Sequence, residues 1–78
     1  MSILIHVMGE DPILAEVEDL PDPKDQFLVC ENPRRRDGRD VEYVLPEVRT
    51  LILPWHRVHC LEVLPGEEEE KVITVVRE

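Results

Sequence analysis

Short apolar runs with a period of two, separated by polar segments that contain proline and glycine, follow one another along most of the chain. In the run at residues 3–8, Ile3, Ile5 and Val7 fall on one face of an extended segment, as in a strand with one buried face. No segment repeats with the 3.6-residue period of a helix, apart from a single turn expected at residues 54–57. The pattern therefore predicts strands at residues 3–8, 13–18, 27–30, 51–53 and 58–64, and one more at 72–76.

Two of these strands are expected in different surroundings. At residues 13–18, Ile13, Ala15 and Val17 alternate with mostly polar neighbours, which predicts a strand with one solvent-exposed face. Residues 27–30 form a continuous apolar run instead. Such a run is typical of a central strand that is covered on both faces.

The polar segments between the strands carry turn signals. Residues 9–12 predict a tight turn, and residues 19–25 predict a loop because two prolines remove backbone donors and fix the backbone. Asp37 followed by Gly38 is a strong turn signal between strands, and residues 41–45 are interpreted as a continuation of the ladder beyond it. Short strands separated in this way predict an all-β fold, whose exposed edges must be paired or protected by charge.

The size of the chain limits its core. A single domain of 78 residues buries about 60% of its unfolded surface, so a disulfide, a metal or association with further copies is the usual support. Cys30 and Cys60 each lie in an apolar run, where a thiol behaves as a small hydrophobe, so we expect no disulfide framework. The first residues lack a basic leader, and no apolar run approaches the roughly 18 residues of a membrane span. We therefore expect a cytoplasmic protein.

Acidic residues outnumber basic residues by 18 to 9, which gives a formal net charge of −9. This charge repels phosphate backbones and argues against general nucleic-acid binding. One basic cluster, expected on an exposed hairpin loop, consists of Arg34, Arg35, Arg36 and Arg39. Its guanidinium groups suit an anion or an acidic partner surface. The alternatives are a solvated loop that neighbouring acids balance, and pairing with acidic residues of another subunit.

Residues 51–65 carry the grouping of side chains that comes nearest to a chemical site. His56, His59 and Cys60 offer nitrogen and sulphur ligands for zinc, but neighbouring strand residues point to opposite faces and the usual zinc spacings are missing. A reactive thiol needs an electropositive, partly open site, which the apolar run around Cys30 does not supply. We therefore expect no enzyme, no cofactor and no metal, with metal-dependent activity at His56 and His59 as a minor alternative.

Two stretches carry a resemblance to a known family. Residues 25–32, DQFLVCEN, and residues 51–65, LILPWHRVHCLEVLP, are similar to the two motifs of the Sm-like (LSm) small β-barrels. The resemblance implies a five-stranded barrel that assembles into a ring through its edge strands and binds U-rich or A-rich RNA at the pore. SH3-type barrels of other families share the short turn before the last strand.

The resemblance also places individual residues. Asp22 or Asp25 stands near the aspartate of the family's first motif, and Gln26 stands near its asparagine. The chain departs from the second motif, because Pro54 and Trp55 replace an arginine–glycine pair and Arg57 lies two residues later. Trp55 either stacks a base, as in single-strand binders, or serves as a cover on the core or as an interface anchor.

These observations lead to one organisation and two main functional hypotheses. We expect residues 1–65 to form a small SH3-type or Sm-like barrel of five strands, residues 66–71 an acidic spacer, and residues 72–78 an extra strand of the same domain or of a neighbouring subunit. The first hypothesis is a homo-oligomer, a ring, that serves as a binding or scaffolding module for itself or for another protein. The residues expected at the subunit contact are Leu51, Leu53, Leu61, Val63, Val72, Ile73 and Val75. The alternative is an RNA-binding protein, with RNA contacts from Asp25, Gln26, Trp55 and Arg57.

Overall fold

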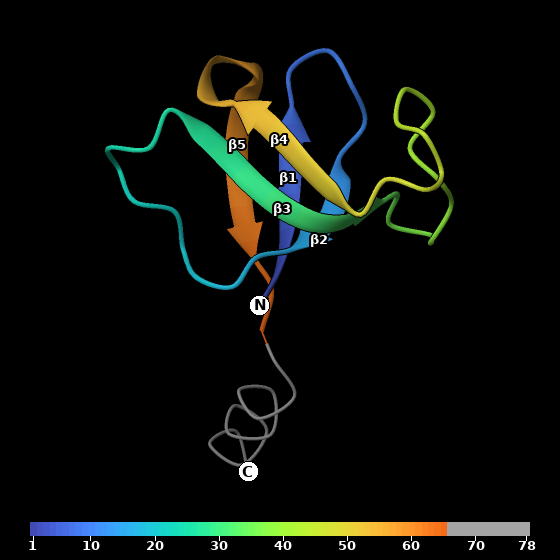
Figure 1. Cartoon of the computed structure of the whole chain (residues 1–78), viewed down its shortest axis with the longest axis horizontal. Coiled ribbons are helices and arrows are strands. Elements are labelled where there is room, and N and C mark those ends of the chain that lie inside the picture. The colour runs from blue at the N-terminus through green and yellow to red at the C-terminus, as the bar shows by residue number, and fades with distance from the viewer. Residues whose placement is uncertain (66–78) are drawn as a thin grey trace, which may run out of the picture.

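The structure is a computed structural model, and it describes residues 1–65 of the chain. Within these residues the fold is all-β, as predicted: a single antiparallel sheet has the strand order β4-β3-β2-β1-β5 (Figure 1). The strands are β1 (Ser2–Val7), β2 (Ile13–Glu16), β3 (Phe27–Arg34), β4 (Thr50–Pro54) and β5 (Val58–Val63). A 3₁₀ turn, η1 (Trp55–Arg57), joins the last two. The predicted acidic spacer and the predicted strand at residues 72–76 lie outside the described residues.

The first strand, β1, lies between β2 and β5. Ile3 faces Ala15 of β2 on one side and Val63 of β5 on the other, and Ile5 faces Ile13 and Leu61 in the same way. Because side chains two residues apart share a face, these cross-strand rows put apolar residues on one side of the sheet. The predicted alternation in residues 3–8 and 13–18 is confirmed.

The core lies between two parts of this one sheet. In Figure 1, β3 and β4 cross in front of β1 and β5. Side chains from both parts meet in one cluster, in which Ile3, Ile5 and Ile13 are fully buried together with Leu28 and Cys30. Burying an aliphatic side chain of this size contributes about 1.5–3 kcal/mol relative to leaving it exposed. The cluster is therefore the main source of stability that the described residues contain.

The short η1 turn explains why the sheet folds over on itself. In a flat sheet of five strands the outer strands would lie about 19 Å apart, since neighbours are spaced by about 4.8 Å. The four residue steps from Pro54 to Val58 cover at most about 14 Å even when fully extended. The sheet must therefore curl, although β4 and β5 do not pair with each other and the sheet stays open.

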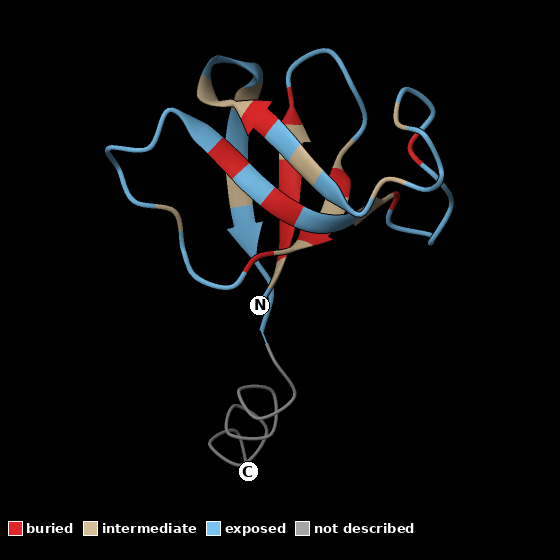
Figure 2. Cartoon of the chain, in the orientation of Figure 1, coloured by how far each residue is buried: buried red, intermediate tan, exposed pale blue. Residues whose placement is uncertain are grey.

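Two predictions about the strands are wrong. Residues 27–30 are covered on one face only: Leu28 and Cys30 are buried, but Phe27 and Val29 are 53% and 54% exposed (Figure 2). Residues 41–45 form turns instead of a strand, because β4 pairs with the free edge of β3 and leaves no edge for them. Val41 alone among them is buried, and it joins the core.

Candidate interaction surface

The two outer strands of the sheet have backbone groups without a strand partner. Among residues 1–65, β4 pairs only with β3, and β5 pairs only with β1. Unpaired N–H and C=O groups along an edge strand are a ready template for pairing with another strand. These two edges are therefore the first candidates for contacts with another chain.

The side chains expected at a subunit contact lie mostly on the inner side of these strands. Leu53 is buried in the core of its own chain, and Leu51 and Leu61 pack against that core. Val63 is 51% exposed and stays available. The other three residues of the predicted contact, Val72, Ile73 and Val75, lie outside the described part of the chain.

An apolar surface that the sequence did not reveal covers the outer face of β3 and β4. We call it the outer-face patch; it consists of Phe27, Val29 and Ile52, the last of which is 59% exposed. Val29 and Ile52 face each other directly across the two strands. The signal in the sequence is the continuous apolar run at residues 27–30, but such a run alone does not distinguish a strand buried on both faces from a strand with one exposed apolar face.

A hollow of about 430 Å³ continues the outer-face patch along β3. One wall is the loop after β2, with Leu20 exposed on it, and the other is β3 itself. Acidic side chains line the same hollow, namely Glu18, Asp19, Asp25 and Glu31. The surface is thus apolar in its middle and negatively charged around it.

The outer face beside β5 carries a polar pair and an exposed thiol instead of an apolar patch. His6 of β1 and Glu62 of β5 form a hydrogen-bonded pair, with 2.5 Å between Nε2 and Oε1, and the exposed Cys60 faces His6 across the two strands. In the described residues no three His, Cys, Asp or Glu side chains are placed to hold a metal ion together. Cys30 is buried, and its burial, together with the charge of Glu31, raises the pKa of the thiol to about 11.

The histidine-containing stretch after β4 forms the corner that the sequence predicted. Two backbone hydrogen bonds hold η1 in place: Trp55 N–H donates to the Gln26 carbonyl at 3.4 Å, and Met8 N–H donates to the Arg57 carbonyl at 2.8 Å. Trp55 is half-buried and packs against the core. His56, within η1, and His59, near the start of β5, are both exposed.

The predicted RNA contacts lie on two neighbouring segments, the end of the loop before β3 and the turn η1. Gln26 and Trp55 are neighbours through the backbone bond described above. Arg57 is exposed, and its guanidinium donates to the Met8 carbonyl at 3.4 Å, at the end of β1. Asp25 lies in the loop before β3, where its carboxylate accepts from the backbone N–H of Asp22. The RNA hypothesis stays an untested prediction.

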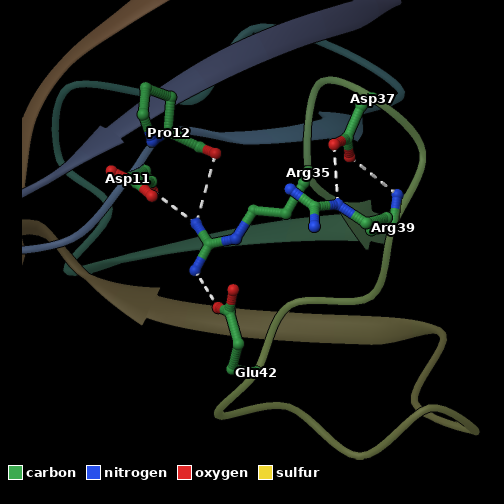
Figure 3. Close-up of polar contacts among 6 residues, drawn as sticks. All are labelled: Asp11, Pro12, Arg35, Asp37, Arg39 and Glu42. Atoms are coloured by element: carbon green, nitrogen blue, oxygen red, sulfur yellow. Dashed lines mark hydrogen bonds and ion pairs between the residues drawn. The ribbon is translucent and has the colours of Figure 1, made fainter.

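The arginine cluster is not presented as one exposed group, which corrects the expectation for Arg35. Arg35 is buried, and its guanidinium donates to the Asp11 carbonyl at 2.7 Å, to the Pro12 carbonyl at 3.4 Å and to the Glu42 carboxylate (Figure 3). The bond from Arg35 lowers the pKa of Glu42 and raises that of Arg35. Arg35 therefore anchors the long loop before β4 to the turn before β2.

The remaining arginines are near the surface. Arg34 is half-buried and pairs with Glu16 at 2.8 Å. Arg39 is exposed and pairs with Asp37 at 2.7 Å, and its backbone N–H lowers the pKa of that carboxyl (Figure 3). Arg36 is exposed. Three of the four arginines are thus paired with an acidic residue of the same chain. A role of the cluster in binding an anion or a partner stays a prediction.

The described residues define an all-β module that consists of one curled, open antiparallel sheet with two unpaired edges. They include no helix of the length and apolar character needed to cross a membrane. Comparison with protein-family models, with curated proteins and with solved structures found no match to this chain.

Proposed function

We propose that the protein is a binding or scaffolding module that associates with copies of itself through the edges of its sheet, in the manner of an Sm-like small barrel. The observation that carries the proposal is that β4 and β5 are both unpaired on their outer sides within residues 1–65. Apolar side chains are exposed on both strands, Ile52 on β4 and Val63 on β5. Pairing β4 of one copy with β5 of the next satisfies both edges and gives a closed ring when the rotation from copy to copy returns to the first copy.

The proposed barrel type has support from the order of the strands and from one connection. β1 lies between β2 and β5, and three residues in a 3₁₀ turn join β4 to β5 across the curled sheet. A short turn before the last strand is a feature that Sm-like and SH3-type barrels share, which supports the proposal. In this proposal the sheet is a barrel in which β4 and β5 do not pair with each other, and each of them pairs with a strand of another copy instead.

The small size of the core also favours self-association. A domain of 78 residues has a small core, and burial against further copies supplies additional apolar contact. The net charge of −9 favours a protein partner over a polyanion. The module is therefore proposed to act through protein contacts, without catalysis.

A substitution at the β5 edge tests the proposal. Val63→Lys places a charge on an exposed edge position, and edge lysines oppose pairing with another strand. We expect the association constant to fall by about tenfold or more, because the charge loses water and an apolar contact is lost. Sedimentation velocity over a series of protein concentrations measures this constant.

The matched control is Met8→Lys, since Met8 is exposed to a similar degree but follows the end of β1 and lies on neither edge strand. This variant is expected to associate like the unmodified protein. Equal association of the Val63→Lys variant and the control would contradict pairing through β5.

A further inference from the structure

We infer that residues 71–77 of one copy dock on the outer-face patch of the neighbouring copy, in the hollow beside β3. This inference rests on the proposed function, because it needs β5 of one copy to lie beside β4 of the next. It adds a second contact between copies and gives the outer-face patch an occupant.

The chemistry of the patch fits the sequence of this segment. Residues 71–77 read KVITVVR, so five consecutive β-branched residues, four of them apolar valine or isoleucine, are bounded by Lys71 and Arg77. The outer-face patch is apolar, and the hollow along it carries Asp25 at one end of the β3 wall and Glu31 at the other. An apolar strand with a cation at each end is therefore complementary to this surface in both polarity and charge.

The spacing of the two cations on the segment also matches the spacing of the two acidic residues along the hollow. Lys71 and Arg77 are six residues apart, and so are Asp25 and Glu31. An extended segment rises by about 3.3 Å per residue, so each pair of charges spans on the order of 20 Å. A segment that lies along β3 brings both cations to acidic residues while its apolar side chains cover Phe27 and Val29.

The point at which the described chain ends favours the neighbouring copy as the source of the segment. The described residues end at Pro65, directly after β5. If β5 pairs with β4 of the next copy, the outer-face patch of that copy starts on the paired strand itself, at Ile52. Residues 66–70 connect Pro65 to this segment, and five extended residues span at most about 17 Å, which is enough to pass from β4 to the hollow beside β3.

Complementary variants of the full chain test the inference. The patch variant carries Phe27→Lys and Val29→Lys, two exposed positions on β3, which is not an edge strand. The segment variant carries Ile73→Asp and Val75→Asp. We expect each variant alone to associate about tenfold more weakly than the unmodified chain, because each loses the apolar contact at every interface.

Mixing the two variants gives the decisive result. In a one-to-one mixture, the intact segment of the patch variant meets the intact patch of the segment variant, so each pair of chains keeps one complete contact. We expect a species of two chains, twice the 9.1 kDa of a single copy, that neither variant forms alone at the same concentration. A control with Leu45→Lys, an exposed apolar residue outside the outer-face patch, is expected to associate like the unmodified chain.

The outcomes separate the inference from the proposed function. If the unmodified chain self-associates but the two variants do so equally well, or the mixture associates no better than its parts, the inference is overturned and edge pairing stands. An unmodified chain that stays monomeric overturns both. Should the variants fail to fold, nuclear Overhauser effects in a mixture of labelled and unlabelled full chains decide: contacts between Phe27 and Ile73 or Val75 of different copies are expected, and their absence in the associated protein overturns the docking.

Discussion

Arg35 is the one polar or charged residue that is buried among residues 1–65. Its guanidinium is buried and donates to the carbonyls of Asp11 and Pro12 and to the carboxylate of Glu42 (Figure 3). We predict that Arg35→Ala lowers the free energy of unfolding by about 2–3 kcal/mol, because hydrogen bonds from a charged group are lost and two carbonyls lose their donor. Urea denaturation monitored by the fluorescence of Trp55 measures the change.

The adjacent Arg36 provides the matched control. It has the same side chain but is exposed, so Arg36→Ala is expected to change the free energy of unfolding by no more than about 0.5 kcal/mol. Equal effects of the two substitutions would show that Arg35 is solvated like its neighbour. Arg35→Lys is also expected to be destabilising, because a lysine cannot reach three acceptors with the planar geometry of a guanidinium.

Cys30 makes the stability depend on pH in the alkaline range. Burial and the charge of Glu31 raise the pKa of its thiol from 9.0 to about 11, so the folded protein keeps this proton to a higher pH than the unfolded chain. The resulting stability is fully present below pH 9 and is lost as the pH rises towards 11, by roughly 2 to 3 kcal/mol. Denaturation of the unmodified chain and of a Cys30→Val variant between pH 8 and 11 checks this, since other groups, such as Tyr43, titrate in both proteins. Parallel pH dependence of the two would contradict it.

At the scale of the elements, a bulge in β3 decides which side chains face the core. Leu14 faces Arg34 and Glu16 faces Glu31, so β3 carries one residue more than β2 between these pairs. Asn32 lies in this interval with a φ of 54°, in the left-handed region that asparagine tolerates better than most residues. The extra residue shifts the alternation, so that Leu28 and Cys30 point inward before the bulge and Arg35 points inward after it.

This geometry predicts a specific response to substitution at Asn32. Asn32→Val is expected to destabilise the protein by about 1–2 kcal/mol, because a β-branched side chain is strained at a positive φ. Asn32→Gly is expected to have the smaller effect, since glycine adopts this conformation without strain. Thermal unfolding followed by circular dichroism compares the two variants; a valine variant as stable as the glycine variant would mean that the backbone at Asn32 is not left-handed.

The bulge also shows which parts of the fold could be predicted from the sequence. The alternation in β1 and β2 predicts their core faces correctly, because Ile3, Ile5 and Val7 are buried in the core, as are Ile13, Ala15 and Val17; Leu4, on the opposite face of β1, is buried as well. The sequence does not reveal which of the consecutive arginines lies inward, because a single extra residue at Asn32 reverses the alternation. Long-range pairing, which local pattern does not encode, determines that β4 takes the edge of β3 and that residues 41–45 form turns.

The candidate surface was predicted less well than the fold, for a related reason. A continuous apolar run such as residues 27–30 is compatible with a strand covered on both faces and with a strand that offers one face to a partner. Only the arrangement of the other strands distinguishes these cases, and it leaves Phe27 and Val29 exposed. In the same way, Leu53 and Leu61 are suitable for an interface by their chemistry but are committed to the core of their own chain.

At the scale of the whole molecule, the open sheet and the negative charge have opposite effects on association between copies. The unpaired edges and the outer-face patch favour association, whereas a net charge of −9 on every copy opposes it. Salt screens charges beyond about 10 Å at 0.1 M, while it leaves apolar contacts in place. The association state at moderate salt therefore depends mainly on the edges and the outer-face patch.

The measurement that tests the central claim most directly is light scattering of the full chain after size exclusion, with absorbance recorded at 260 and 280 nm. The account predicts a mass of several times 9.1 kDa with a protein-like absorbance ratio. A mass of several copies with excess absorbance at 260 nm would instead favour an RNA-binding ring. A single mass of 9.1 kDa at every concentration would contradict self-association through the sheet edges.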